Sequence, residues 1–319
     1  MMDWKQSLVE PKNASGFSIL TSRLDPYRAQ GKPLRHHYVP EFYLRRWATG
    51  GLVRGYYWDH RSRSLSMSKK GAKAFCHEVD LYKFASEPTE RSHLLETKFL
   101  GTVDDKAGKI IGKISKGDLQ SLTDDEACHW VRFLMSLEVR RPSVVGFLKR
   151  HASKDFIDAL DADAEFLSEM EQFDIRGRPS EILGSATTLH IQDRMLLRIQ
   201  EAIDDPEIGK HYLRMSWLTK KLSTGGIDLV VADRPFIREG GIEAPDNVWC
   251  LPLDPDTAFF CSNNRNLLIE LEHASACQLS KAINRCSVEQ ADKYVFDKSG
   301  RNSRLLERLG KARTKPKEL

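Results

Sequence analysis

Apolar residues recur with helical spacing through the middle of the chain. Between residues 94 and 114 they fall on one stripe of a long helix. Thr123-Asp124-Asp125-Glu126 has the residues of a capping box and opens a second apolar stripe, which Pro142 bends or ends. Residues 155–173 and 185–203 predict two further amphipathic helices. The middle of the protein is therefore expected to be helical.

A short helix and a hairpin are predicted before this helical region. Residues 1–32 contain proline, glycine and asparagine with little periodicity, which predicts an irregular arm. Pro40 suits the first turn of a helix, and apolar residues then recur at helical spacing as far as Trp47. Residues 52–58 and 65–68, separated by a polar turn, predict a β-hairpin.

The last third of the chain has the pattern of strands. Residues 215–220 and 227–232 are strand-like, and Gly225-Gly226 between them is a hairpin signal. Residues 248–253 and 257–262 form a second candidate pair, joined by a turn that contains a proline between two aspartates. Two antiparallel pairs are therefore expected in this part.

A helix from about residue 273 to 295 is expected to follow these strands. Strands near both ends of a helical centre indicate an α+β fold, with a helical middle and short antiparallel strands from the N-terminal hairpin and the C-terminal third. We expect the hairpin to join the C-terminal strands in one composite domain, residues 33–297. The arm precedes this domain and a tail, residues 298–319, follows it. The alternative is two domains divided near residue 205.

Composition narrows the class of protein. With 319 residues, 40% of them apolar and 29% charged, the chain has the balance of a folded protein. No apolar run approaches the roughly 20 residues that span a bilayer, and the first residues lack the apolar region of a secretory signal. The six cysteines form no CxxC pair. We therefore expect a cytoplasmic protein with no membrane partner.

The positive charge is concentrated at the C-terminal end. From residue 298 to 319, eight lysines and arginines stand against Glu307 and Glu318, a local balance of +6 in a chain whose net charge is +4. Such a tail is able to bind phosphate backbones, so nucleic acid is a candidate partner. The alternative is a solvated segment that keeps the protein soluble. Oligomeric state is not encoded in any pattern that we recognise.

Residues 36–47, His-His-Tyr-Val-Pro-Glu-Phe-Tyr-Leu-Arg-Arg-Trp, resemble the opening signature of the domain of unknown function 4238 family, found mostly in bacteria. The later segments that resemble this family, in the same order, are Arg140-Arg141-Pro142, Ala232-Asp233-Arg234-Pro235-Phe236, Leu251-Pro252-Leu253-Asp254-Pro255, Asn284, Ala291 and Tyr294-Val295-Phe296. Arg141 and Ala232 replace the Thr and Ser expected of the family. The resemblance spans residues 35–297 and implies no particular activity.

Two nuclease motifs are suggested by short segments, and neither fits its context. His36-His37 is reminiscent of HNH nucleases, in which a histidine activates water beside a metal. However, a helix follows directly, and His60 falls in the hairpin turn with no Asn between it and His37. Glu96-Thr97-Lys98 suggests a PD-(D/E)xK nuclease, but it precedes Asp228 and has helical periodicity. It is better explained as a solvated pair on a helix face.

Two classes of function remain. The first is an enzyme acting on nucleic-acid or nucleotide phosphodiesters, with His37 as base or ligand, Asp233 as catalytic carboxylate and Arg140 as phosphate clamp. His36 and Arg141 are further candidate binding residues, and Mg²⁺ or Mn²⁺ is the candidate cofactor. The second class is a non-catalytic binding module in which the histidine motif is structural. In this second class, Asp233 stabilises a turn, and the two arginines cap the C-terminal carbonyls of a helix.

Overall fold

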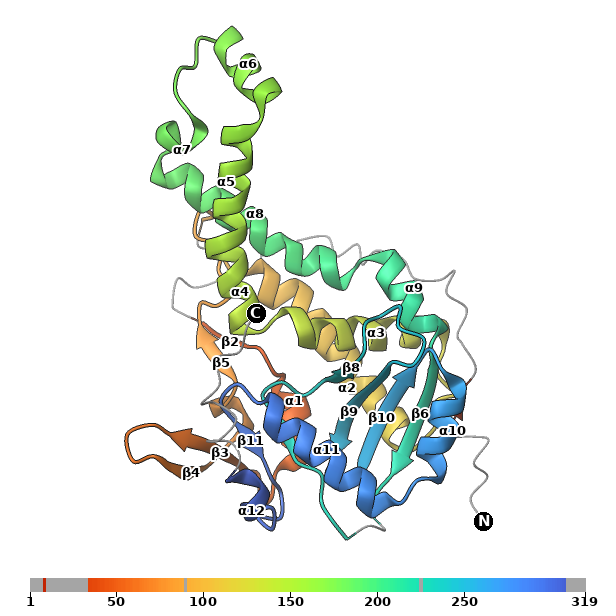
Figure 1. Ribbon diagram of the computed structural model, residues 1–319. Helices are drawn as coiled ribbons and strands as arrows, with labels where there is room; N and C mark the ends of the chain where they lie inside the picture. Colours follow the sequence, from red (N-terminus) through yellow and green to blue (C-terminus); the bar gives the residue numbers. More distant parts are fainter. Residues whose placement is uncertain (1–7, 10–33, 89–90, 224–225, 308–319) are drawn as a thin grey trace.

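A five-stranded antiparallel sheet forms the centre of the molecule (Figure 1). The computed structural model describes residues 8–9, 34–88, 91–223 and 226–307. In spatial order the strands are β1 (Leu8–Val9), β6 (Ser216–Lys221), β10 (Thr257–Ser262), β9 (Val248–Asp254) and β8 (Ile237–Glu239). The β9–β10 pair and its turn confirm the second predicted hairpin.

Helices cover both faces of this sheet, and every residue of β10 is buried as a result. Those on one face are α2 (Gly101–Ser115) and α3 (Asp124–Val139), and those on the other are α10 (Arg265–His273) and α11 (Ala276–Gln290). Because side chains alternate along a strand, Phe259 packs against Trp130 of α3. Its neighbour Phe260 joins a separate cluster with Leu268 and Ile283. A strand buried on both faces requires the uninterrupted apolar run seen in the sequence.

A second sheet joins N-terminal and C-terminal segments of the described chain. In spatial order its strands are β4 (Ser64–Lys70), β3 (Val53–Asp59), β11 (Val295–Phe296) and β7 (Val231–Ala232). Val295 pairs with Tyr56 on one side and with Ala232 on the other. The predicted N-terminal hairpin is thus confirmed, and it joins C-terminal strands as expected. The predicted α+β class is confirmed as well.

The short helix α1 (Glu41–Leu44) and the 3-10 turn Arg45–Trp47 hold both sheets together. The Tyr43 hydroxyl donates to the carbonyl of Pro252 at the end of β9. The indole N–H of Trp47 donates to the Leu229 carbonyl over 2.9 Å. Both rings have at most 1% of their surface exposed, so the predicted short helix is confirmed and its aromatic side chains pack into the core.

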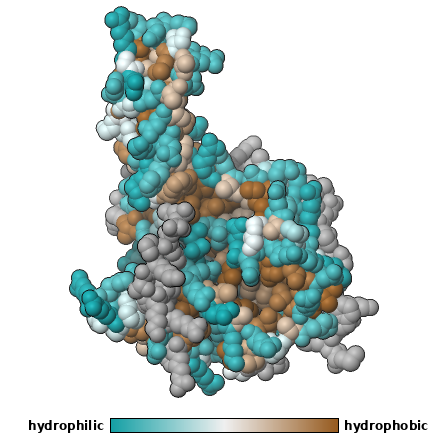
Figure 2. Space-filling view, in the orientation of Figure 1, coloured by the Kyte–Doolittle hydropathy of each residue, from teal (hydrophilic) through white to brown (hydrophobic). Residues whose placement is uncertain are grey.

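A helical arm projects from the body, and its surface is largely hydrophilic (Figures 1 and 2). The helices between α3 and β6 are α4 (Pro142–Phe147), α5 (Ser153–Ala162), α6 (Ala164–Gln172), α7 (Pro179–Ile182), α8 (Ser185–Ile203) and α9 (Pro206–Arg214). The capping box at Thr123 and the helix over residues 185–203 are confirmed. The helix expected over 155–173 is divided, because the Asp163 side chain accepts two backbone N–H groups and caps α6. No helix in the described ranges has the length and apolarity needed to span a membrane.

Two other predictions in the C-terminal third are wrong. The hairpin at Gly225-Gly226 does not form, because β6 and β7 belong to different sheets. The backbone N–H groups of Leu229 and Val230 are satisfied by the Pro255 carbonyl and the Asn284 side chain, not by a strand ladder. The helix expected from 273 to 295 ends at Gln290, and the chain then enters β11.

The predicted N-terminal arm, residues 1–32, and the predicted tail, residues 298–319, lie mostly outside the described residues. Within the arm, Leu8 and Val9 form a strand against β6. Within the tail, α12 (Ser303–Leu306) places Leu306 in a buried cluster with residues of α11 and β11. The division into arm, domain and tail therefore stays a prediction.

The contact between β3 and β11 depends on the absence of a side chain at Gly55. A Cβ there would lie 2.8 Å from the Phe75 ring and 3.0 Å from the Phe296 ring. We expect Gly55→Ala to destabilise the protein by about 1–3 kcal/mol through overpacking. Gly71→Ala is the matched control, since φ is −60° at Gly71 and no heavy atom lies within 4 Å of its Cβ position. Equal urea midpoints for the two variants would contradict this view of the interface.

Candidate functional site

A cluster of polar side chains surrounds a two-stranded ribbon formed by β2 (Arg35–His37) and β5 (His77–Val79). The backbone here is irregular. Cys76 and Asp80, on either side of β5, have positive φ values of 50° and 56°. A π-helical segment, Leu95–Leu100, packs nearby and leads into α2. Positive φ at residues other than glycine and π-helical turns both occur preferentially at functional sites, so this region is the candidate site.

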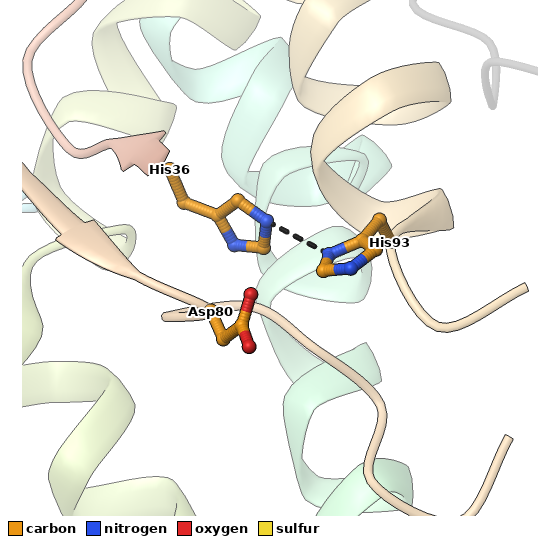
Figure 3. A group of neighbouring side chains, drawn as sticks. All are labelled: His36, Asp80 and His93. Atoms are coloured by element: carbon orange, nitrogen blue, oxygen red, sulfur yellow. Dashed lines mark hydrogen bonds between the residues drawn. The ribbon is translucent and has the colours of Figure 1, made fainter. Parts of the chain in front are cut away.

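His36, the first histidine of the signature, points inward from β2 and is fully buried. Its Nε2 lies 3.0 Å from Nδ1 of His93, and its Nδ1 accepts the backbone N–H of Tyr82 over 2.9 Å. The Tyr82 ring stacks on the imidazole with an interplanar angle of 7°. Figure 3 shows the Asp80 carboxylate pointing toward both imidazoles from the turn after β5.

These hydrogen bonds assign the proton on each ring. Because Nδ1 of His36 accepts from Tyr82, the neutral ring carries its proton on Nε2 and donates it to Nδ1 of His93. Burial, followed by the proximity of His93, lowers the pKa of His36 from 6.5 to about 4. Burial also lowers the pKa of His93. Both imidazoles are therefore neutral near pH 7.

The same three residues have the chemistry of a metal site. In the part of the chain that the structure describes, the ligand atoms of His36, Asp80 and His93 all lie within 4.8 Å of one another. Two histidines and a carboxylate suit zinc or iron. However, a histidine that binds a metal through Nε2 carries its proton on Nδ1 and donates from it. Nδ1 of His36 is an acceptor instead, so the observed hydrogen bonds do not fit a metal ligand.

A second polar group surrounds Arg140 at the C-terminal end of α3. The Arg140 side chain has no exposed surface, and its Nη1 donates to Asp104 of α2 over 2.9 Å. Its carbonyl accepts the hydroxyl of Tyr82, which connects this group to His36. Nε and Nη2 of Arg140 have no partner among the described residues, although both are buried.

Glu96 is the second carboxylate of this group, and it comes from the π-helical segment. Its Oε1 accepts the backbone N–H of His37 over 3.3 Å, whereas Oε2 is buried without a partner in the described ranges. Burial and the negative charge of Asp104 raise the pKa of Glu96 from 4.5 to about 7, against the opposing effect of Arg140. A carboxyl that titrates near neutral pH is suited to proton transfer.

The structure brings together three of the five residues singled out in the sequence. His36 and Arg140 are linked through Tyr82, and the backbone of His37 is linked to Arg140 through Glu96. The His37 ring is half-buried, lies 5.5 Å from the His77 ring, and donates from Nε2 to the Lys73 carbonyl over 3.2 Å. Arg141, which follows α3, donates to the carbonyl of Glu138 near the C-terminal end of that helix.

Asp233 does not belong to this cluster of hydrogen-bonded groups. It is buried at the end of β7, where its carboxylate accepts the backbone N–H groups of Asp292, Lys293 and Tyr294. Burial raises its pKa to about 6, against the lowering effect of these N–H groups. The three bonds organise the turn that carries the chain from α11 into β11, so Asp233 has the alternative, structural role that its place beside a turn suggests.

Sequence reasoning misses Asp80, His93, Glu96 and Asp104. The prediction that Glu96 is a solvated residue on a helix face is wrong, because its Oε2 is buried. One usable signal is the spacing of His93 and Glu96, which places both on one side of a helical turn. Asp80 carries no such signal, because its position depends on the positive φ that follows β5.

The proton assignment on His36 is directly testable by NMR with 15N-labelled histidine. We expect Nε2 to be protonated, Nδ1 to be unprotonated, and the ring to titrate with a pKa of about 4. Because the folded state then binds fewer protons than the unfolded state below pH 6.5, this group should remove up to about 3 kcal/mol of stability as the pH falls from 6.5 to 4. Loss of the Nε2 proton signal on addition of Zn²⁺ would contradict the assignment.

Comparison with known proteins places the chain in a family. A family model described as protein of unknown function (DUF4238) matches residues 35–301. No curated protein and no solved structure matches the chain. The matched range covers most of the chain and contains both polar groups around β2. The chain therefore belongs to the DUF4238 family of proteins of unknown function.

Proposed function

We propose that this protein is an enzyme acting on phosphodiesters of nucleic acids or nucleotides, with its chemistry centred on Glu96 and Arg140. The observation that carries the proposal is the pair of groups that are buried without partners in the described ranges, Oε2 of Glu96 and the Nε and Nη2 of Arg140. Leaving buried polar atoms of a charged group without hydrogen-bond partners is costly. A phosphate oxygen would accept hydrogen bonds from the guanidinium group, which matches oxyanions in geometry.

Glu96 is assigned the role of general base in this proposal. Its pKa of about 7 means that much of the carboxyl group is ionised at neutral pH yet basic enough to take a proton from water. The water oxygen forms the new bond to phosphorus, the ester bond to the leaving oxygen breaks, and solvent protonates that oxygen. The His37 backbone positions Glu96, which replaces the direct role for the His37 ring inferred from the sequence.

A divalent cation remains part of the proposal. Mg²⁺ and Mn²⁺ prefer oxygen ligands. Glu96 and Asp104 supply two carboxylates that are close enough to interact electrostatically beside Arg140. Asp104 raises the pKa of Glu96 through like-charge repulsion, which a bound cation would relieve. A cytoplasmic location fits the six free cysteines.

The alternative function is a non-catalytic binding module in which Arg140 has a structural role. It is favoured by the full burial of the Arg140 side chain, which leaves no surface for direct contact with a substrate in this conformation. The two functions differ in what removal of the Glu96 charge does. In the enzyme it abolishes turnover, whereas in the binding module it changes stability alone.

Turnover should depend on the ionisation of Glu96. Purified protein is incubated with DNA, RNA and cyclic nucleotides, with Mg²⁺, with Mn²⁺ and with a chelator. We expect kcat/KM to rise with pH through a midpoint near 7 and to fall by about 100-fold or more in Glu96→Gln. Glu78→Gln, an exposed change on the neighbouring β5, is the matched control. Absence of cleavage under all conditions, or equal cleavage by both variants, would refute the proposal.

The stability of Glu96→Gln tests the environment of this carboxyl independently of turnover. Because the folded-state pKa is raised, the folded protein binds more protons than the unfolded chain between pH 4.5 and 7. The parent should therefore lose stability across this window as the pH rises, whereas the variant should not. In urea unfolding, the free energy of unfolding of the variant relative to that of the parent should increase by up to about 3 kcal/mol between pH 4.5 and 8. A constant difference would show that Glu96 has an ordinary pKa.

A further inference from the structure

A cationic groove lies on α11, outside the site around Glu96 and Arg140. Its volume is about 890 Å³, and its walls are α11, the segment after Gly226 and the residues around Arg301. Gln278, Lys281 and Arg285 follow one another at three- and four-residue spacing, which places them on one face of the helix. Arg301 contributes a third cation from the loop after β11.

Among the residues that the structure describes, no acidic side chain forms an ion pair with the three cations of this groove. Lys281, Arg285 and Arg301 make no salt bridge with any residue in the described ranges, and Asp228 is the single carboxylate among the described lining residues. Other surface cations, such as Lys154 and Arg198, do pair with acidic side chains of their own helices. The groove therefore has a local excess of positive charge that attracts anions.

The walls of the groove are held in place by buried polar contacts. The Asn284 side chain accepts the N–H of Val230 and donates to the carbonyl of Asp228, each over 2.9 Å. This ties α11 to the segment that forms the opposite wall. On the third side, buried Asp297 accepts the N–H groups of Ser299 and Asn302, which shapes the loop that carries Arg301. The cations thus project from a preformed surface.

We infer that this groove binds the phosphate backbone of nucleic acid. No aromatic side chain is found among the described lining residues, so the groove offers no platform on which a base could stack. Contacts through lysine and arginine alone position a backbone without reading its sequence. The sequence after Arg301 contains six further lysines and arginines.

The groove favours a nucleic-acid backbone over a membrane surface. None of the large hydrophobic side chains found exposed elsewhere in the described structure lines the groove. A concave surface also suits a strand of phosphates better than a flat layer of lipid headgroups. Binding in the groove does not require catalysis at Glu96, since neither Glu96 nor Arg140 is among the described residues that line it.

The test measures binding of the full chain to a labelled duplex oligonucleotide at several salt concentrations. The groove variant combines Lys281→Gln, Arg285→Gln and Arg301→Gln. The matched control combines Arg61→Gln, Lys69→Gln and Lys70→Gln, which removes the same charge from exposed positions of the β3–β4 hairpin. We expect the groove variant to bind at least about 10-fold more weakly, with the salt slope reduced by about 0.9 for each phosphate that it no longer neutralises. The control should bind within about twofold of the parent, and Glu96→Gln should bind as the parent does.

Three results would overturn the inference. Equal weakening by the groove variant and the control would show that overall charge alone matters. Loss of binding on deletion of residues 308–319, with the groove variant unaffected, would assign binding to the tail. Binding to vesicles that contain an anionic lipid, without binding to the duplex, would assign the groove to a membrane surface. Circular dichroism of each variant confirms that these surface changes leave the fold intact.

Discussion

The burial of one positive charge, on Arg140, organises the region where α2, α3 and the β2–β5 ribbon meet. A guanidinium group removed from water requires nearby negative charge and hydrogen-bond acceptors. Asp104 supplies the direct ion pair, and Glu96 adds a second carboxylate close enough for each charge to affect the other. Tyr82 bonds to the Arg140 carbonyl and stacks on His36. The end of α3, the start of α2 and the β2–β5 ribbon therefore all contribute groups that compensate the burial of a single side chain.

The family signature describes contacts more than chemistry. Tyr43 of its first segment bonds to Pro252 of a later one, and Asp233 bonds to the backbone of Tyr294 in the last. Segments that are far apart in the sequence are thus partners in space. This explains why the signature identifies relatives so well while giving little indication of activity. Glu96, whose pKa is raised to about 7, lies outside the motif segments.

Local patterns allow much of the fold to be predicted, and long-range pairing sets the limit. The Thr123 capping box and the turn before Thr257 are encoded by neighbouring residues, so the helix and hairpin that they define are predicted directly. Strands such as β7 and β11 have only two residues each, too few for a periodic pattern. The environment of Glu96 is equally beyond a local pattern. Its burial depends on Arg140 and Asp104, which approach it only in the folded chain.

The placement of β11 between β3 and β7 has a consequence for the order in which the protein folds. During synthesis β3 and β4 emerge early, yet the strand that covers the open edge of β3 is among the last segments of the described chain. An uncovered edge readily pairs with other chains. The nascent hairpin is therefore exposed to misassembly until Val295 and Phe296 leave the ribosome. Pairing over such a distance also raises the contact order, which slows folding. The charged turn and the lysines at the end of β4 would then protect the growing chain during that interval.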